Sequence, residues 1–132
     1  MKYLLDTHVW LWMLSTPERL RKNVRDIVEN PENILILSSA SSWEIAIKVA
    51  NGRLFLPESI EVYIPKCMRL TGVQGIPIQH AHALAVATLP PHHRDPIDRL
   101  LIAQAQVEKV PIITVDPVFA NYDIELVGES RQ

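Results

Sequence analysis

Short apolar segments alternate with helical patterns along the chain, and this alternation restricts the fold more than any other feature of the sequence. The apolar segment 2–5 ends at Asp6, and the residues after it continue with helical periodicity. The run 34–37 is continuously apolar and partly β-branched, which is typical of a strand covered on both faces of a parallel sheet. Signals for β-hairpins do not occur between the strand segments. The sequence therefore predicts the α/β class, a sandwich around a mostly parallel sheet.

The other elements follow from periodicity and from the residues that begin and end helices. Thr16 and Pro17 predict an N-cap and a first helical turn, and Pro65 should kink or break any helix around it. We expect strands at 2–5, 34–37, 75–78, 111–115 and 124–127. We expect helices after Asp6, from Thr16 to Asn30, and at 39–50, 58–70, 80–88 and 97–107.

Length and composition indicate one domain, residues 1–132. A chain of 132 residues with 48% hydrophobic residues can bury one core and has no room for a second domain. The single cysteine, Cys67, cannot form an intramolecular disulfide, and the first residues contain neither a basic leader nor an uninterrupted apolar run. We therefore expect a soluble, cytoplasmic protein without a membrane role.

The formal net charge of −2 gives no sign of a protein that coats nucleic acid through excess basicity. Taken alone, this charge argues against RNA binding. Four carboxylates gathered around metal ions would, however, leave the rest of the chain with a net positive charge. The net charge therefore argues less strongly against an RNA ligand, but it still gives no support for one.

Four acidic residues follow predicted strands or begin predicted helices. In parallel α/β sheets, ligands bind at the carboxyl ends of the strands, where such residues meet. Carboxylates so close together would repel one another unless cations were present, and hard oxygen ligands select Mg²⁺ or Mn²⁺. The candidate metal-binding and catalytic residues are Asp6, Glu44, Asp98 and Asp116.

Each of these acids also has a structural explanation. Asp6 could N-cap the following helix, and Asp116 precedes a proline in a turn, where aspartate is common. Glu44 lies three residues after Ser41, as in a capping box. If the helix instead starts near Ser39, Glu44 lies one turn in and can point toward the strand ends.

The DPID segment raises the same question for two aspartates. Asp95 is expected to N-cap a helix whose first residue is Pro96, and Asp98 is a first-turn acid favoured by the helix dipole. We predict that Asp95 is mainly a cap. Asp98 projects from a helix start near the strand ends and is the stronger candidate for the site.

The histidines allow two interpretations. A zinc site built from His80, His82, His92 and His93 is disfavoured because His80 and His82 diverge on a helix and no thiolate assists. A basic rim beside the acidic residues would instead help to hold a phosphate. The residues of that rim, which could contact RNA, are His92, His93, Arg94 and Arg99.

Taken together, the motifs resemble those of PIN-domain ribonucleases, and in particular the VapC-type toxins of bacterial and archaeal toxin-antitoxin pairs. The resemblance rests on four segments that span nearly the whole chain in the expected order. They are LLDTHVWLW, SSWEIAIKVANGRLFLP, HHRDPIDRLLIAQA and IITVDPVF.

The resemblance implies a three-layer α/β/α fold, a homodimer, and inhibition by a small cognate antitoxin whose tail enters the active-site groove. It also implies that Asp6, Glu44, Asp98 and Asp116 are the acidic metal-binding residues. Asp95, Thr7 and Thr114 are accessory candidates, the threonines as residues that orient ligands or water. The implied reaction is hydrolysis of an RNA phosphodiester by metal-activated water, leaving a 5′-phosphate and a 3′-hydroxyl.

Two rival functions fit parts of the pattern. A phosphotransferase or phosphatase with a nucleophilic aspartate after its first strand usually has a second acid two residues later, where this chain has His8. A non-catalytic receiver-like or RNA-binding module could keep an acidic metal pocket. A phosphate-accepting aspartate would be expected after an internal strand, with a lysine at a later strand end, whereas Thr114 and Asp116 occupy that end here.

Overall fold

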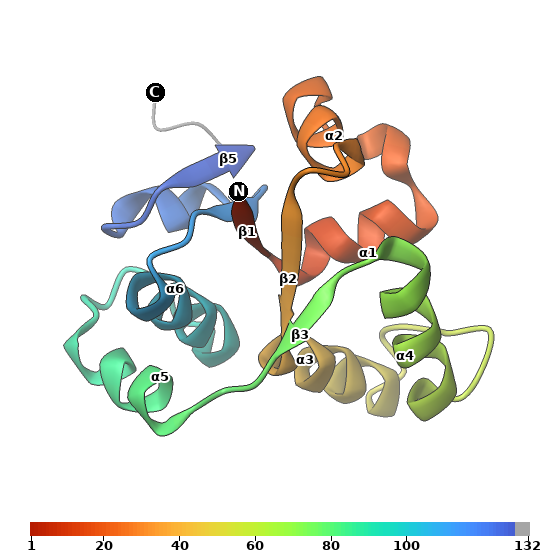
Figure 1. The fold of residues 1–132 in the computed structure, drawn as a ribbon. Coiled ribbons are helices and arrows are strands. Elements are labelled where there is room, and N and C mark those ends of the chain that lie inside the picture. The colour runs from red at the N-terminus through yellow and green to blue at the C-terminus, as the bar shows by residue number, and fades with distance from the viewer. Residues whose placement is uncertain (129–132) are drawn as a thin grey trace.

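A five-stranded sheet runs through the middle of the molecule, with helices on both of its faces (Figure 1). The computed structural model describes residues 1–128. The strand order is β3-β2-β1-β4-β5, and all four neighbouring pairs are parallel, as predicted. The strands are β1 (Lys2–Leu5), β2 (Ile34–Ser38), β3 (Gln74–Ile76), β4 (Ile112–Thr114) and β5 (Leu126–Gly128).

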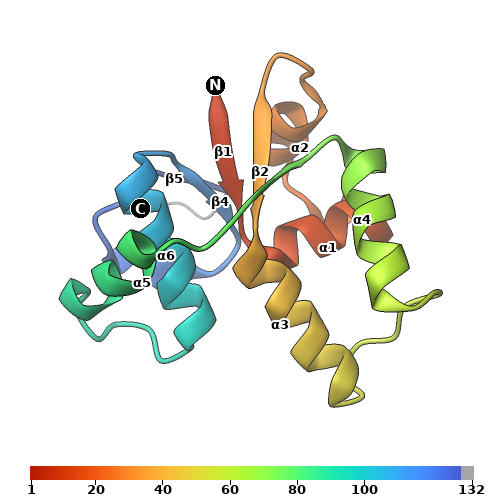
Figure 2. The ribbon, with the colours of Figure 1, turned by 60° about the horizontal axis from the view of Figure 1, so that its bottom comes forward.

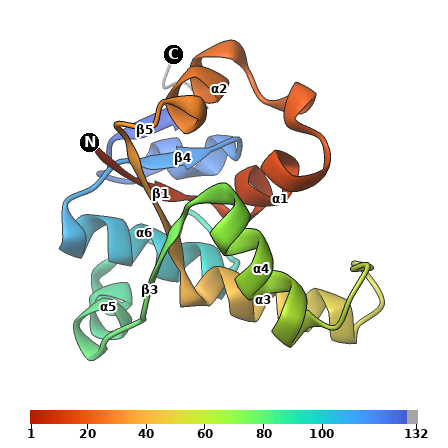
Figure 3. The same ribbon diagram turned by 45° about the vertical axis from the view of Figure 1, so that its right-hand side comes forward.

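The helices form two layers, one on each side of this sheet. Figures 1 and 3 show α1, α2 and α4 on one side and α5 and α6 on the other. The α-helices are α1 (Thr7–Ser15), α2 (Lys22–Glu29), α3 (Ser39–Ala50), α4 (Ile60–Thr71), α5 (His80–Ala85) and α6 (Pro96–Glu108). Three short 3-10 helices are η1 (Pro17–Arg19), η2 (Val86–Thr88) and η3 (Pro117–Asn121).

The alternation of side chains along the strands divides the core into two clusters. Leu5 on β1 packs with residues of α1, α2 and α4, whereas its neighbour Leu4 points to the opposite face and packs with α6. Helix α3 contributes to both clusters, through Ile45 on one side and Ala40 on the other. The prediction of a three-layer α/β/α sandwich is therefore confirmed.

The strand order reverses beside β1, because β2 and β3 continue to one side of it and β4 and β5 to the other. Figure 2 shows α1 and α3 starting where β1 and β2 end. Such a switch point is where open parallel sheets bind ligands, since the connections leave the sheet in opposite directions there.

The helix predicted from Thr16 to Asn30 is wrong in its first part. Pro17 begins only the 3-10 helix η1, and the backbone is then extended at Leu20 (φ −75°, ψ 137°) and Arg21 (φ −62°, ψ 155°). Helix α2 begins after Arg21 and places Val24 in the core. Burial of Leu20 between the two short helices outweighs the local preference for one continuous helix.

Pro65 does not interrupt its helix, contrary to the prediction. Helix α4 runs from Ile60 to Thr71, with Pro65 on its exposed side. The buried residues Ile64 and Cys67 on the other side hold the helix against the core, and this tertiary packing offsets the hydrogen bond that proline cannot donate.

The remaining boundaries differ from the predictions by a few residues. The segment 80–88 is helical, but it consists of the short helix α5 followed by η2. Within residues 1–128, no helix has the length and apolar character needed to cross a membrane.

Candidate metal centre

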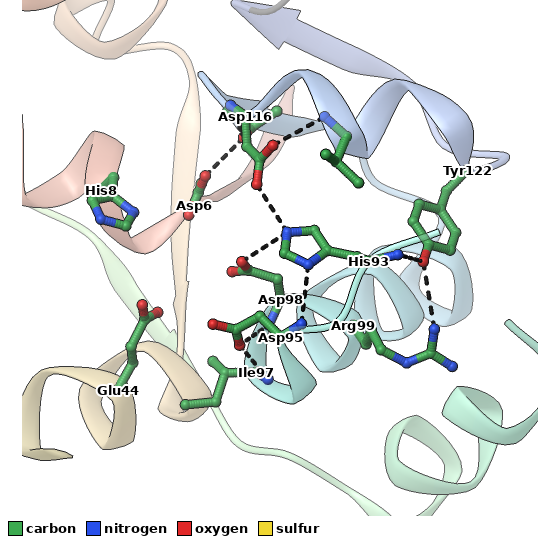
Figure 4. A network of polar contacts seen from close by, with 12 residues as sticks. Asp6, His8, Glu44, His93, Asp95, Ile97, Asp98, Arg99, Asp116 and Tyr122 are labelled. Atoms are coloured by element: carbon green, nitrogen blue, oxygen red, sulfur yellow. Dashed lines mark hydrogen bonds and ion pairs between the residues drawn. The ribbon is translucent and has the colours of Figure 1, made fainter. Parts of the chain in front are cut away.

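The fold brings the four predicted acidic residues to one edge of the sheet. Asp6 follows β1, Asp116 lies two residues after β4, Glu44 lies in the second turn of α3, and Asp98 lies in the first turn of α6. Figure 4 shows these carboxylates around one central region. We refer to the four residues together as the acidic site.

Asp6 lies at the centre of the acidic site and is 2% exposed. Its backbone is at the N-cap position of α1, but its side chain makes no capping hydrogen bond. Instead, Thr114 Oγ1 donates to Asp6 Oδ2 at 2.7 Å, and Asp6 Oδ1 is buried without a hydrogen-bond partner among residues 1–128. Burial is the largest cause that raises the pKa of Asp6 above its usual value.

The two accessory threonines have different roles in the structure. Thr114 donates to Asp6 and its Oγ1 also accepts the Asp116 backbone N–H at 3.0 Å, so it connects two members of the acidic site. Thr7 Oγ1 donates to Ser41 Oγ at 2.8 Å and thereby joins the first turns of α1 and α3. Thr114 thus orients carboxylates directly, and Thr7 fixes the helices that carry them.

Glu44 is not part of a capping box with Ser41. Helix α3 starts earlier, at Ser39, and Ser38 caps it by accepting the Ala40 N–H at 3.0 Å. Glu44 therefore lies one turn into the helix and its carboxylate reaches the acidic site (Figure 4). Its Oε2 is 3.1 Å from Lys48 Nζ, while its Oε1 is buried without a partner in the described part of the chain.

The predicted arrangement of Asp95, Pro96 and Asp98 is confirmed. Asp95 Oδ1 accepts the backbone N–H groups of Ile97 at 2.8 Å and Asp98 at 3.2 Å, and Pro96 is the first residue of α6. Asp95 is thus an N-cap, and whether its charge also serves the site stays a prediction.

Asp98 is a second acid of the site whose pKa is raised. Burial is the largest cause that raises its pKa, to about 8, and repulsion from neighbouring carboxylates adds to it. Those neighbours are Asp6, Asp95, Glu44 and Asp116.

Asp116 takes part in a turn and in the acidic site at once. Its Oδ1 accepts the Val118 N–H at 2.9 Å and caps η3, and its Oδ2 lies 2.9 Å from His93 Nε2. The same His93 nitrogen is 3.1 Å from Asp98 Oδ2. His93 therefore lies between two of the predicted metal-binding carboxylates (Figure 4).

The donor set of the acidic site fits a divalent cation. All four predicted ligands are carboxylates, and two of their oxygens, Asp6 Oδ1 and Glu44 Oε1, are buried without a partner within residues 1–128. A buried carboxylate oxygen without a hydrogen bond is costly, and a hard cation would offset that cost. Among the described residues, the group with metal-binding spacing is His93, Asp98 and Asp116.

The predicted basic rim is divided in the structure. His92 and Arg94 are exposed, and the His92 ring packs edge-on against Tyr122. Arg99 donates to the carbonyl oxygens of Pro90, Val86 and Leu89, so its guanidinium holds the loop before α6. His92 and Arg94 thus lie at the surface, whereas Arg99 is engaged in the fold.

The alternative zinc site does not form. His82 is buried, and its Nε2 contacts Glu108 Oε2 at 2.8 Å. Of the four histidines considered, His93 is the one that occurs in a group with metal-binding spacing in residues 1–128.

Sequence reasoning missed Lys48 and the contacts of His93. Lys48 lies four residues after Glu44 on the same helix, a spacing that brings opposite charges together, and its Nζ also lies 3.3 Å from His8 Nε2. That spacing is visible in the sequence. The contact between His93 and Asp116 joins residues 23 apart in the chain, and no local pattern predicts it.

Comparison with known proteins gives one family. The family model of the PIN domain matches residues 3–125. A 58-residue segment is 43% identical to Ribonuclease VapC16 of Mycobacterium tuberculosis, which is 44% of this chain and 41% of that protein. The match thus spans less than half the length of this relative.

Solved structures share the fold. VapBC2 from Rickettsia felis bound to a DNA fragment from its promoter has a chain with a TM-score of 0.71 and 16% identity, covering 96% of this chain and 98% of that one. VapBC-1 from nontypeable Haemophilus influenzae has a TM-score of 0.65 and 19% sequence identity, over 96% of this chain and 97% of that one. A toxin-antitoxin complex from Klebsiella pneumoniae has a TM-score of 0.63 and 17% sequence identity, over 97% of this chain and 98% of that one.

Proposed function

Since the chain belongs to the PIN-domain family, we propose that it is a metal-dependent endoribonuclease that hydrolyses RNA phosphodiesters, acting as one nuclease domain in the cytoplasm. The observation that carries the proposal is the acidic site itself. Four carboxylates converge at the switch point of the sheet, and two of their oxygens are buried and unpaired within residues 1–128. The name of the partial relative, Ribonuclease VapC16, supports the same reaction.

We assign Asp6, Asp98 and Asp116 as the residues that hold Mg²⁺ or Mn²⁺, and Glu44 as the residue that holds a second ion or positions water. When bound, such an ion supplies an activated water and neutralises charge on the phosphodiester. Oxygen ligands favour Mg²⁺ and Mn²⁺ over softer metals.

The other residues of the chain orient these carboxylates. Thr114 donates to Asp6 Oδ2, which turns the unpaired Oδ1 toward the centre of the acidic site. Lys48 balances the charge of Glu44 and stands beside it as a cation that can meet a phosphate oxygen. His92 and Arg94 are exposed near the start of α6 and provide further contacts for the RNA backbone.

We further propose that the chain is the toxin of a toxin-antitoxin pair and forms a homodimer. The name of the similar toxin-antitoxin complex from Klebsiella pneumoniae supports the first part, and the homodimer rests on the family resemblance alone. A guanidinium from the tail of a small cognate antitoxin suits the acidic site, because it can replace the charge of a metal with bidentate hydrogen bonds. Overexpression should be toxic, and coexpression with the antitoxin should relieve the toxicity. A purified complex with full nuclease activity would contradict inhibition at this site.

An RNA cleavage assay that identifies the ends of the products tests the nuclease proposal directly. The purified protein should cut single-stranded or structured RNA with Mg²⁺ or Mn²⁺, leave 5′-phosphates, and stop in excess EDTA. Asp6→Asn should abolish cutting, whereas the matched control Asp26→Asn, an exposed aspartate on α2, should not. Undiminished cleavage in EDTA would refute the metal-dependent reaction. Metal binding without any cleavage would favour the non-catalytic module.

A further inference from the structure

His93 is held on several sides by contacts that involve both ring nitrogens. Its backbone N–H donates to Tyr122 Oη at 2.7 Å, and its ring packs edge-on against Phe119 with the ring centres 5.7 Å apart. Its Nε2 faces the Oδ2 atoms of Asp116 at 2.9 Å and Asp98 at 3.1 Å. The ring is therefore fixed between two carboxylates that belong to different elements (Figure 4).

The second ring nitrogen determines where the proton of His93 lies. The backbone N–H of Asp95 donates to His93 Nδ1 at 3.1 Å. A nitrogen that accepts a hydrogen bond carries no proton, so the neutral imidazole must carry its proton on Nε2. His93 then donates from Nε2 to Asp98 and Asp116.

The same contact prevents His93 from acting as a metal ligand in this conformation. Coordination through Nε2 would require its proton to move to Nδ1, where it would meet the N–H of Asp95. That backbone group is itself fixed, because Asp95 caps α6 through two hydrogen bonds. The local sequence HRDP thus sets the proton position of the histidine.

We propose that His93 is a positioning residue of the acidic site: its Nε2–H holds the carboxylates of Asp98 and Asp116 together and orients them for a cation, without binding that cation. The part that concerns the cation rests on the proposed function. Outer-shell donors of this kind fix the direction of a ligand's remaining lone pairs, and their removal typically lowers metal affinity about 10- to 100-fold.

Two measurements on the full-length protein test this role. Two-bond proton–nitrogen correlation spectra of histidine-labelled protein should show the Nε2–H tautomer of His93 without metal, and the same tautomer after Mg²⁺ is added. Calorimetry with Mn²⁺ should show an affinity about tenfold lower for His93→Phe, which keeps the ring shape and loses the donor. His93→Gln, which places an amide N–H near the Nε2 position, should recover part of that loss.

His80→Phe is the matched control, because His80 is an exposed histidine on α5, and it should bind Mn²⁺ like the wild type. A deprotonated His93 Nε2 in the presence of Mg²⁺ would overturn the proposal in favour of direct coordination. An unchanged Mn²⁺ affinity in both His93 variants would overturn it as well. If His93→Phe fails to fold, the spectra and His93→Gln still decide. Failure of the nuclease proposal is distinguishable, because cleavage would then be missing in a wild type that binds Mn²⁺ and shows the expected tautomer.

Discussion

Apart from Asp6, the acidic site and the polar side chains next to it form two halves that are held in different ways. The α6 half is built from a loop, a helix start and the turn after β4, and consists of His93, Asp95, Asp98 and Asp116. The α3 half is built from two helices and consists of His8, Glu44 and Lys48. In the α6 half, the groups that contact the carboxylates are backbone N–H groups and the His93 imidazole. In the α3 half, Glu44 is paired with the partly exposed ammonium of Lys48.

This difference indicates which half changes when a ligand binds. Neutral donors that belong to the backbone cannot leave, so we expect the α6 half to have the same arrangement with and without a cation. The side chain of Lys48 is long, flexible and 26% exposed. A metal can therefore take the place of Lys48 beside Glu44, or a phosphate can take the place of Glu44 beside Lys48. The α6 half is thus prepared by the fold, and the α3 half is completed by the ligand.

The largest expected effect comes from removing one charge from each half. Asp98→Asn and Glu44→Gln should each lower the rate of RNA cleavage by at least about 100-fold. Loss of a residue that only orients a metal ligand costs up to about 100-fold, and these two residues are assigned to hold the ions themselves. Asp98→Asn should stay folded, because asparagine resembles the protonated form of the buried Asp98. Cleavage rates measured beside melting temperatures would show this. Near-normal cleavage by Glu44→Gln alone would restrict catalysis to the α6 half.

The second effect concerns pH and acts through the α6 half. Burial raises the pKa of Asp98 from its usual 3.8 to about 8, so the folded state binds more protons than the unfolded state between these pH values. The unfolding free energy of the metal-free protein should therefore fall as pH rises from about 4 to about 8. A cation competes with this proton, so Mn²⁺ affinity should rise by at most about tenfold per pH unit up to that pKa.

Melting temperatures at pH 6, 7 and 8 check the expected fall in stability, and calorimetry at the same pH values checks the expected rise in Mn²⁺ affinity. The groups that face Asp98 are Asp6, Glu44, His93, Asp95 and Asp116. Asp98→Asn is the control, because it removes this proton and should weaken both pH dependences, leaving the part that comes from the raised pKa of Asp6. A metal-free protein that becomes more stable over this pH range would show that Asp98 is not the controlling group.

The third effect concerns the α3 half and is smaller. Lys48→Met removes a cation that competes with the metal for Glu44, so Mn²⁺ should bind more tightly. The gain should be at most about fivefold, which corresponds to the ~1 kcal/mol upper range of a partly exposed ion pair. RNA should bind more weakly, because a phosphate contact is lost. Lys22→Met, on α2, is the matched control, and a weaker Mn²⁺ affinity in Lys48→Met would contradict the competition.

The comparison also shows what could be predicted from the sequence. The α/β sandwich followed from alternating apolar strands and helices, and the cap formed by Asp95 and Pro96 followed from residues that are adjacent in the chain. Glu44 was ambiguous, because spacing alone fits both a capping box and a position one turn into the helix. The start of α3 at Ser39 decides between them, and it is set by the Ser38 cap at the end of β2.

Features that depend on tertiary contacts were not predictable in the same way. The single helix expected from Thr16 to Asn30 is interrupted because Leu20 enters the core, and α4 continues through Pro65 because its buried side is held. Asp6 was open to a capping role until Thr114, 108 residues away, was found to be its partner. Local pattern thus predicted the scaffold and offered the four acids as candidates, and long-range contacts determined how their side chains are oriented.

The smallest expected effect separates the cap from the charge within the α6 half. Asp95→Asn keeps a side-chain oxygen that can accept from Ile97 and Asp98, so the unfolding free energy should change by only a few tenths of a kcal/mol, about the spread among good N-cap residues. Asp95→Ala removes that acceptor and should cost about 1 kcal/mol. Without the cap, the backbone at position 95 is no longer fixed, and its N–H no longer holds His93 Nδ1 in place. Mn²⁺ affinity should therefore fall in the alanine variant and not in the asparagine variant. Denaturant unfolding and Mn²⁺ calorimetry on both variants make the comparison. If Asp95→Asn loses Mn²⁺ affinity while its stability is unchanged, the charge of Asp95 belongs to the acidic site and the cap is only part of its role.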